Sequence, residues 1–161
     1  ATVRLFARAL GKEKEVEERL AEIDTRLEAL REGQTNPQTV SVIRWNPQGP
    51  VLMSGQLFTG QLIRAAGFDT LPLANDLGNR PHSDTLSLEN LVQIDADWLF
   101  LASLTADGEK ALNEAQKQPA FQRLEAVQNN QVKVVDGQIW SSGYGPLAAE
   151  VIILDLSQIA E

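Results

Sequence analysis

From residue 39 onward, predicted β-strands alternate with predicted α-helices, and this alternation constrains the fold most strongly. Segment 39–45 (TVSVIRW) alternates in polarity and is rich in β-branched residues, which is typical of a strand. Further strands are predicted at 71–73, 97–102 and 132–136, and helices at 59–66, 86–94, 107–117, 120–126 and 145–159. Strands separated by helices predict a parallel sheet with helices on both faces. We therefore expect a three-layer α/β/α, Rossmann-like lobe with a mainly parallel central sheet.

A long amphipathic helix is predicted before this unit, at residues 12–31. Its apolar residues are spaced four, three, four and three apart among charged residues: Val16, Leu20, Ile23, Leu27 and Leu30. One narrow apolar stripe is typical of a helix that packs along a single face. At about 1.5 Å per residue such a helix is roughly 30 Å long, which is the length of a whole domain. On this pattern alone, an ordinary surface helix or a dimerising coiled-coil arm is an equally good interpretation.

Composition excludes several classes of site. The 161 residues are enough for one domain with a hydrophobic core. A formal charge of −8 disfavours affinity for phosphate backbones, so we expect no nucleic-acid partner. The absence of cysteine excludes disulfides, thiolate metal sites and a cysteine nucleophile. With His82 as the only histidine and no acidic cluster, we also expect no metal site made of protein side chains.

Motifs for nucleotide binding and for hydrolysis are poorly represented. No Walker A loop is present, and SGQLFTG is a weak match to the glycine pattern of dinucleotide-binding loops. No serine stands in a nucleophile elbow. A Rossmann-like nucleotide-binding or enzymatic domain remains the alternative interpretation, but it lacks a phosphate cradle or a catalytic pair.

Aromatic and cationic residues are predicted on the loops that follow the strands. Ligands of open parallel sheets bind beyond the carboxyl ends of the strands. We expect this crevice to be lined by Arg44, Trp45, Phe58, Arg80, His82, Trp140 and Tyr144. Such residues suit a bulky, partly aromatic, anionic ligand held by stacking and charge-assisted hydrogen bonds, with no catalyst among them. Core packing is the alternative role for the two tryptophans, and stabilisation of a turn is the alternative for His82.

Five segments in a fixed order resemble one known family, the substrate-binding proteins of ABC importers for ferric siderophores, haem and vitamin B12. The most specific of them is HSDTLSLENLVQIDADWLFLA. The others are LGKEKEVEERLAEIDTRLEAL, RAAGFD, PAFQRLEAVQNNQVKVVDGQIW and GPLAAEVIILDL. Together they cover essentially the whole chain.

This resemblance implies two α/β lobes joined by one rigid helix, with the ligand between them. It divides the chain into a remnant of the N-terminal lobe (1–11), the interdomain helix (12–33) and the C-terminal lobe (38–161). It implies a monomer that is periplasmic or lipid-anchored, a parent protein with a signal peptide, and a ferric siderophore as ligand. Because the siderophore holds the iron, no cofactor of the protein's own is expected.

The resemblance also implies a role for Glu89 in the segment SLENL. In this family a glutamate on the outer surface of each lobe docks against arginines of the membrane permease, and Glu89 occupies the matching position. A carboxylate in the first turn of a helix is favoured by the helix dipole and stays available for a guanidinium. The alternative is that Glu89 only stabilises the start of its helix.

Overall fold

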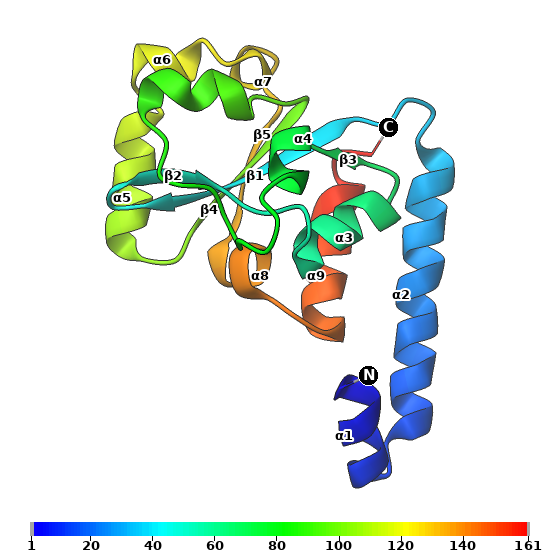
Figure 1. Cartoon of the computed structure of the whole chain (residues 1–161). Coiled ribbons are helices and arrows are strands. Elements are labelled where there is room, and N and C mark those ends of the chain that lie inside the picture. Colours follow the sequence, from blue (N-terminus) through cyan, green and yellow to red (C-terminus); the bar gives the residue numbers. More distant parts are fainter. Residues whose placement is uncertain (1, 161) are drawn as a thin grey trace.

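A helical hairpin lies beside an α/β unit in the computed structural model, which describes residues 2–160 (Figure 1). Helices α1 (Thr2–Leu10) and α2 (Glu13–Gly33) form the hairpin, and α1 with the first turns of α2 extends past the α/β unit. Ala1, the first residue of the expected remnant 1–11, lies outside the described residues. The predicted helix at 12–31 is confirmed, and its apolar stripe packs against the unit through buried Ile23 and Leu27.

The central sheet has the order β2-β1-β4-β5, with the short β3 beside the start of β1. Strands β3, β4 and β5 join the sheet in parallel pairs, and only β2 is antiparallel to its neighbour. The mainly parallel sheet expected from the sequence is therefore confirmed. Its strands are β1 (Thr39–Asn46), β2 (Gly49–Leu52), β3 (Asp69–Thr70), β4 (Trp98–Ser103) and β5 (Val132–Asp136).

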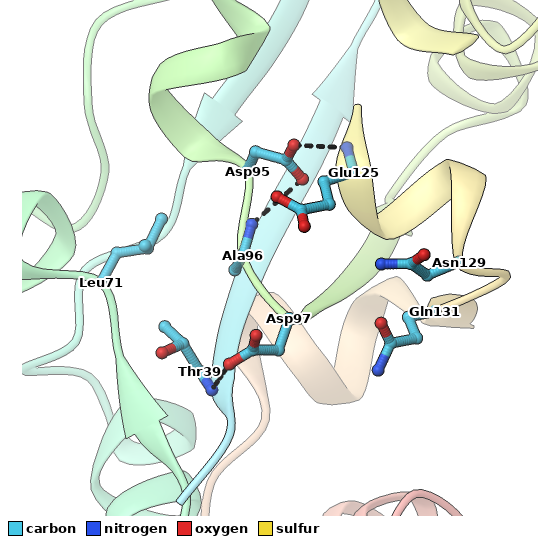
Figure 2. A pocket seen from close by; sticks show the side chains of 8 residues that line it. All are labelled: Thr39, Leu71, Asp95, Ala96, Asp97, Glu125, Asn129 and Gln131. Atoms are coloured by element: carbon cyan, nitrogen blue, oxygen red, sulfur yellow. Dashed lines mark hydrogen bonds between the residues drawn. The ribbon is translucent and has the colours of Figure 1, made fainter. Parts of the chain in front are cut away.

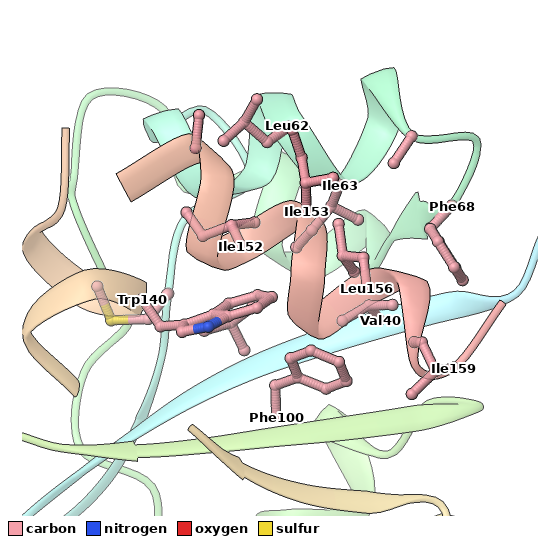
Figure 3. Close-up of a cluster of buried hydrophobic side chains, with 14 of the residues drawn as sticks. Val40, Leu62, Ile63, Phe68, Phe100, Trp140, Ile152, Ile153, Leu156 and Ile159 are labelled. Carbon is pink, nitrogen blue, oxygen red and sulfur yellow. The ribbon is translucent and has the colours of Figure 1, made fainter. Parts of the chain in front are cut away.

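Helices cover both faces of the sheet and complete the three layers. On the first face, α2, α3 (Phe58–Ala65), α8 (Gly137–Ser142) and α9 (Pro146–Ser157) pack over Val40 and Val42 of β1, around the buried rings of Phe100 and Trp140 (Figure 3). On the opposite face, a second group of helices covers Ile43 and Trp45 of β1. These are α4 (Pro72–Asn75), the 3₁₀-helix η1 (Leu88–Ile94), α5 (Ala106–Ala115), α6 (Pro119–Gln122) and α7 (Glu125–Gln128).

Several predicted elements differ from the structure. The strand expected at 71–73 is wrong, because β3 ends at Thr70 and α4 begins at Pro72, where a missing N–H costs a helix nothing. The helix expected at 120–126 is divided into α6 and α7. Of the helix expected at 86–94, only Leu88–Ile94 is helical, as a 3₁₀-helix, and the Ser87 side chain makes no capping hydrogen bond. Strand β2 and helix α8 were not predicted.

None of the described helices is both long and apolar enough to cross a membrane.

Candidate functional site

The carboxyl ends of three parallel strands meet in a row, which we name the carboxyl edge. In the register of the sheet Trp45 pairs with Ser103, and Ser103 pairs with Asp136. Beyond these residues the chain turns into α5 after β4 and into α8 after β5. Because ligands of open α/β sheets bind beyond this end of the strands, the carboxyl edge is the candidate ligand-binding surface.

Arg44, on β1 near this edge, carries an uncompensated charge. It is half-buried, and its Nε is buried without a hydrogen-bond partner. Among the described residues, no carboxylate forms an ion pair with its guanidinium. A partly buried cation without a counter-charge is costly unless an anion pairs with it. The position and charge of Arg44 therefore suit an anionic ligand.

Phe58 and Tyr144 form an aromatic pair where two helices begin. Their ring centroids are 5.0 Å apart at an interplanar angle of 51°, and Tyr144 is 70% exposed. Phe58 is the first residue of α3, and Tyr144 precedes Gly145, the N-cap of α9. Neither helix has a side-chain cap or an acidic residue in its own first turn. The pair offers a stacking surface beside two electropositive helix ends.

The two tryptophans expected in the ligand crevice lie in the core instead. Trp45 is 2% exposed and packs edge-on against Phe121 on the face that α5 and α6 cover. Trp140 is fully buried, and its ring packs edge-on against Phe100. The expectation that they line the crevice is therefore wrong for this structure, since neither ring reaches the surface of the carboxyl edge.

Helix α8 is the reason that Trp140 is buried. The sequence GQIWSSGYGP was interpreted as a loop, but the Asp136 side chain accepts a hydrogen bond from the Ile139 amide at 3.0 Å and caps a short helix. The helix turns Trp140 inward, where its indole Nε1 donates to Asp155 Oδ2 at 2.8 Å. Lys133 completes this group with its Nζ 3.3 Å from Asp155 Oδ1. An aspartate directly before a glycine-initiated turn was the signal for the cap.

Arg80 and His82 lie along the β2 side of the sheet and not at the carboxyl edge. His82 forms a bridge with Met53, just beyond the end of β2, and its Nδ1 is 2.7 Å from the Ser83 carbonyl oxygen. Arg80 is exposed, and its Nη1 lies 3.5 Å from Asp84 Oδ2. Neither has a described contact with Arg44, Phe58 or Tyr144, so their place in the ligand site stays a prediction.

Glu89 lies in the first turn of η1 and is exposed. Among the described residues it has no hydrogen-bond or ion-pair partner through its side chain. This position is accessible to a partner protein, and the proposed docking role stays a prediction.

A pocket of about 260 Å³ lies at the opposite, amino end of the strands (Figure 2). Its carboxylates already accept hydrogen bonds from the backbone: Asp95 from the Glu125 amide at 2.6 Å, and Asp97 from the Thr39 amide at 2.7 Å. Within residues 2–160 no group of three or more histidine or acidic side chains is arranged to hold a metal ion. These carboxylates join loops to helices and strands, and we do not assign a ligand to this pocket.

Comparison with known proteins decides the family. The sequence profile described as "Periplasmic binding protein" matches residues 1–139. The chain belongs to this family. It is 26% identical to the probable siderophore-binding lipoprotein YfiY of Bacillus subtilis, over 94% of the chain and 50% of that protein. It is also 26% identical to the achromobactin-binding periplasmic protein of Dickeya dadantii, over 98% of the chain and 54% of that protein. The chain thus spans about half the length of the curated relatives it matches.

Solved structures of this family have the same fold. Staphylococcus aureus SirA superposes with a TM-score of 0.82 at 24% identity, over 99% of the chain and 64% of SirA. FeuA of Bacillus subtilis, complexed with ferri-bacillibactin, gives a TM-score of 0.72 at 21% identity, over 92% of the chain and 55% of FeuA. The family consists of binding proteins, and the relatives named here are periplasmic or lipoproteins.

Proposed function

We propose that this chain is the C-terminal lobe and connecting helix of the substrate-binding component of an ABC importer for ferric siderophores. The observation that carries the proposal is Arg44, which lies on β1 near the carboxyl edge and whose guanidinium has no ion-pair partner among residues 2–160. A carboxylate or catecholate oxygen of a ferric chelate would supply that charge. The relatives described as binding siderophores, achromobactin and Fe(3+) dicitrate support this ligand class.

The proposed complex is one of binding without turnover. Arg44 would pair with the anionic chelate, while the Phe58–Tyr144 pair would stack on its apolar or aromatic part. Iron would enter as part of the chelate, so the protein needs no metal ligand or cofactor of its own. A second lobe would form the other wall of the site, and α2 would join the two. We further propose that the whole protein is monomeric and periplasmic or lipid-anchored.

Delivery of the chelate is assigned to a membrane permease. Glu89 would pair there with an arginine, because its exposed carboxylate has no partner within the described part of the chain. This step is separate from ligand binding. Glu89→Ala should therefore lower transport and leave ligand affinity unchanged.

The binding proposal is tested with Arg44→Ala and Arg44→Lys. Titrations with ferric dicitrate, ferric achromobactin, ferric staphyloferrin B and ferri-bacillibactin should show that one chelate binds the whole protein. Loss of a charge-assisted hydrogen bond is worth about 1.5–3 kcal/mol, so Arg44→Ala should weaken that chelate roughly ten- to hundredfold. The chelate affinity of Arg44→Lys should lie between those of the unaltered protein and Arg44→Ala. An ammonium keeps the positive charge but cannot form the bidentate contact of a guanidinium.

Arg26→Ala is the matched control, since Arg26 is an exposed arginine of α2 beside α9. It should bind the chelate like the unaltered protein. Absence of binding to every chelate would refute the proposal. So would a nucleotide that stabilises the protein against heat when no chelate does, which would favour the Rossmann-like nucleotide-binding alternative.

A further inference from the structure

Tyr144 lies on a short link between two helices. It follows α8 and precedes the N-cap of α9, so a glycine stands on each side of it, Gly143 and Gly145. The Gly143 amide donates to the Ile139 carbonyl oxygen at 2.9 Å, which fixes the start of the link to the last turn of α8. Tyr144 is 70% exposed, and its ring packs on the ring of Phe58 at the start of α3. The geometry of the ring pair therefore depends on how the end of α8 lies relative to the start of α3.

One buried hydrogen bond joins these two helix ends. Thr59, the residue after Phe58, is 5% exposed, and its hydroxyl donates to the Trp140 carbonyl oxygen of α8 at 3.0 Å. Helices α3 and α8 are otherwise connected mainly through α9, on which each of them packs. The Thr59 hydroxyl is therefore the direct link that holds the end of α8, and with it Tyr144, beside Phe58.

A cavity of about 250 Å³ adjoins both rings. The side chains around it are mostly apolar, Ile23 of α2 among them, and its charged members are Arg4 and Asp24. An apolar cavity of roughly 150 Å³ is enough to hold a benzene molecule, so this cavity has room for one aryl ring. Aromatic rings attract one another in offset-stacked and edge-to-face contacts. Phe58 and Tyr144 therefore favour an aryl group at this place over an aliphatic one.

We propose that Thr59 is a positioning residue of the ligand site, whose hydroxyl holds the Phe58–Tyr144 pair in the arrangement on which an aryl group of the chelate stacks. The ligand class is then a catecholate or another aryl-bearing siderophore, and not a purely aliphatic chelate such as ferric dicitrate. Thr59 is buried and acts through the two rings. This inference rests on the proposed function, because that function supplies the chelate.

The test is a double-mutant cycle on the affinity of the whole protein for ferri-bacillibactin, the chelate in the FeuA complex, whose catecholate groups are aryl rings. Thr59→Val, Tyr144→Leu and the double variant are titrated at a temperature at which circular dichroism shows each of them folded. Each single change should weaken binding about three- to tenfold, which is the range expected for one aromatic contact. In the Tyr144→Leu background, Thr59→Val should change the affinity by less than about twofold, because the ring that it positions is gone.

Two variants serve as controls. Thr59→Ser keeps the hydroxyl and should restore the affinity to within about twofold of that of the unaltered protein. In Thr25→Val the lost hydroxyl bond, to the Ala21 carbonyl oxygen, lies on the exposed side of α2. This variant should also bind within about twofold of the unaltered protein.

Each other outcome overturns a defined statement. Unchanged affinity in Thr59→Val, or the same weakening with and without the Tyr144 ring, would refute the positioning role and leave the proposed function intact. Binding of ferric dicitrate without binding of ferri-bacillibactin would refute the aryl ligand and also leave the proposed function intact. Failure of every chelate to bind would refute the proposed function, and the inference with it.

Discussion

Thr59→Val would remove one buried hydrogen bond that joins two helices of the candidate site. Thr59, in the first turn of α3, is 5% exposed, and its hydroxyl donates to the Trp140 carbonyl oxygen at 3.0 Å. That carbonyl is among the last four of α8, which have no partner within a helix. Valine has nearly the shape of threonine, so the change leaves little cavity and isolates the loss of the hydroxyl.

Thr59→Val leaves the Trp140 carbonyl oxygen buried without a hydrogen bond, which should lower the free energy of unfolding by about 1–3 kcal/mol. For a chain of this size, a loss of about 2 kcal/mol lowers Tm by roughly 4–8 °C. Thr59→Ser keeps the hydroxyl and loses one methyl group, which costs about 1 kcal/mol. Thr59→Ala loses both the hydroxyl and the methyl group, so it should lower the free energy of unfolding by about as much as Thr59→Val and Thr59→Ser together.

Thr25→Val is the control, because the Thr25 hydroxyl also donates to a backbone carbonyl, that of Ala21, but on the exposed side of α2. Water replaces that bond, so the free energy of unfolding should change by less than about 0.5 kcal/mol. Urea unfolding followed by circular dichroism measures all four variants. Equal stability of Thr59→Val and Thr25→Val would refute the reasoning that the Thr59 bond supports α8.

Two further predictions concern close packing and ionisation. Gly137→Ala should destabilise the chain by several kcal/mol in urea unfolding, because a Cβ there would collide with a backbone carbonyl of β4, whereas Gly33→Ala meets open space and should not destabilise it. The hydrogen bond from Arg4 lowers the pKa of Glu17. The stabilisation of the folded chain by this pair is therefore fully present at a pH above the pKa of an unpaired glutamate. It is lost as the pH falls through the lower pKa of Glu17 in the folded chain. Carboxyl ¹³C titration by NMR should show this lowered pKa, and Arg4→Ala should return it to the ordinary range; an unchanged Glu17 titration in Arg4→Ala would contradict the assignment.

Long periodic segments were predicted well because their pattern repeats over several turns or several strand residues. The stripe of α2 and the eight-residue strand β1 are examples. Strand β2 and helix α8 are four and six residues long, too short for a period to be recognised. They depend on local signals, namely the Pro47 turn before β2 and the Asp136 cap before α8. The short elements account for the largest error at the candidate site, the position of Trp140.

What the sequence determined by itself is the order of the longer elements, the mainly parallel sheet, the long helix with one buried stripe and the acidic charge. These properties follow from periodicity and composition, which need no knowledge of distant contacts. The tertiary structure alone decided which aromatic rings are exposed and which lie in the core. The Trp140 ring is held in the core by Asp155 of another helix, and its backbone carbonyl accepts a hydrogen bond from Thr59, which is 81 residues away in the chain, while Tyr144 four residues later is left exposed. Both residues follow the same strand, and only contacts made after folding distinguish them.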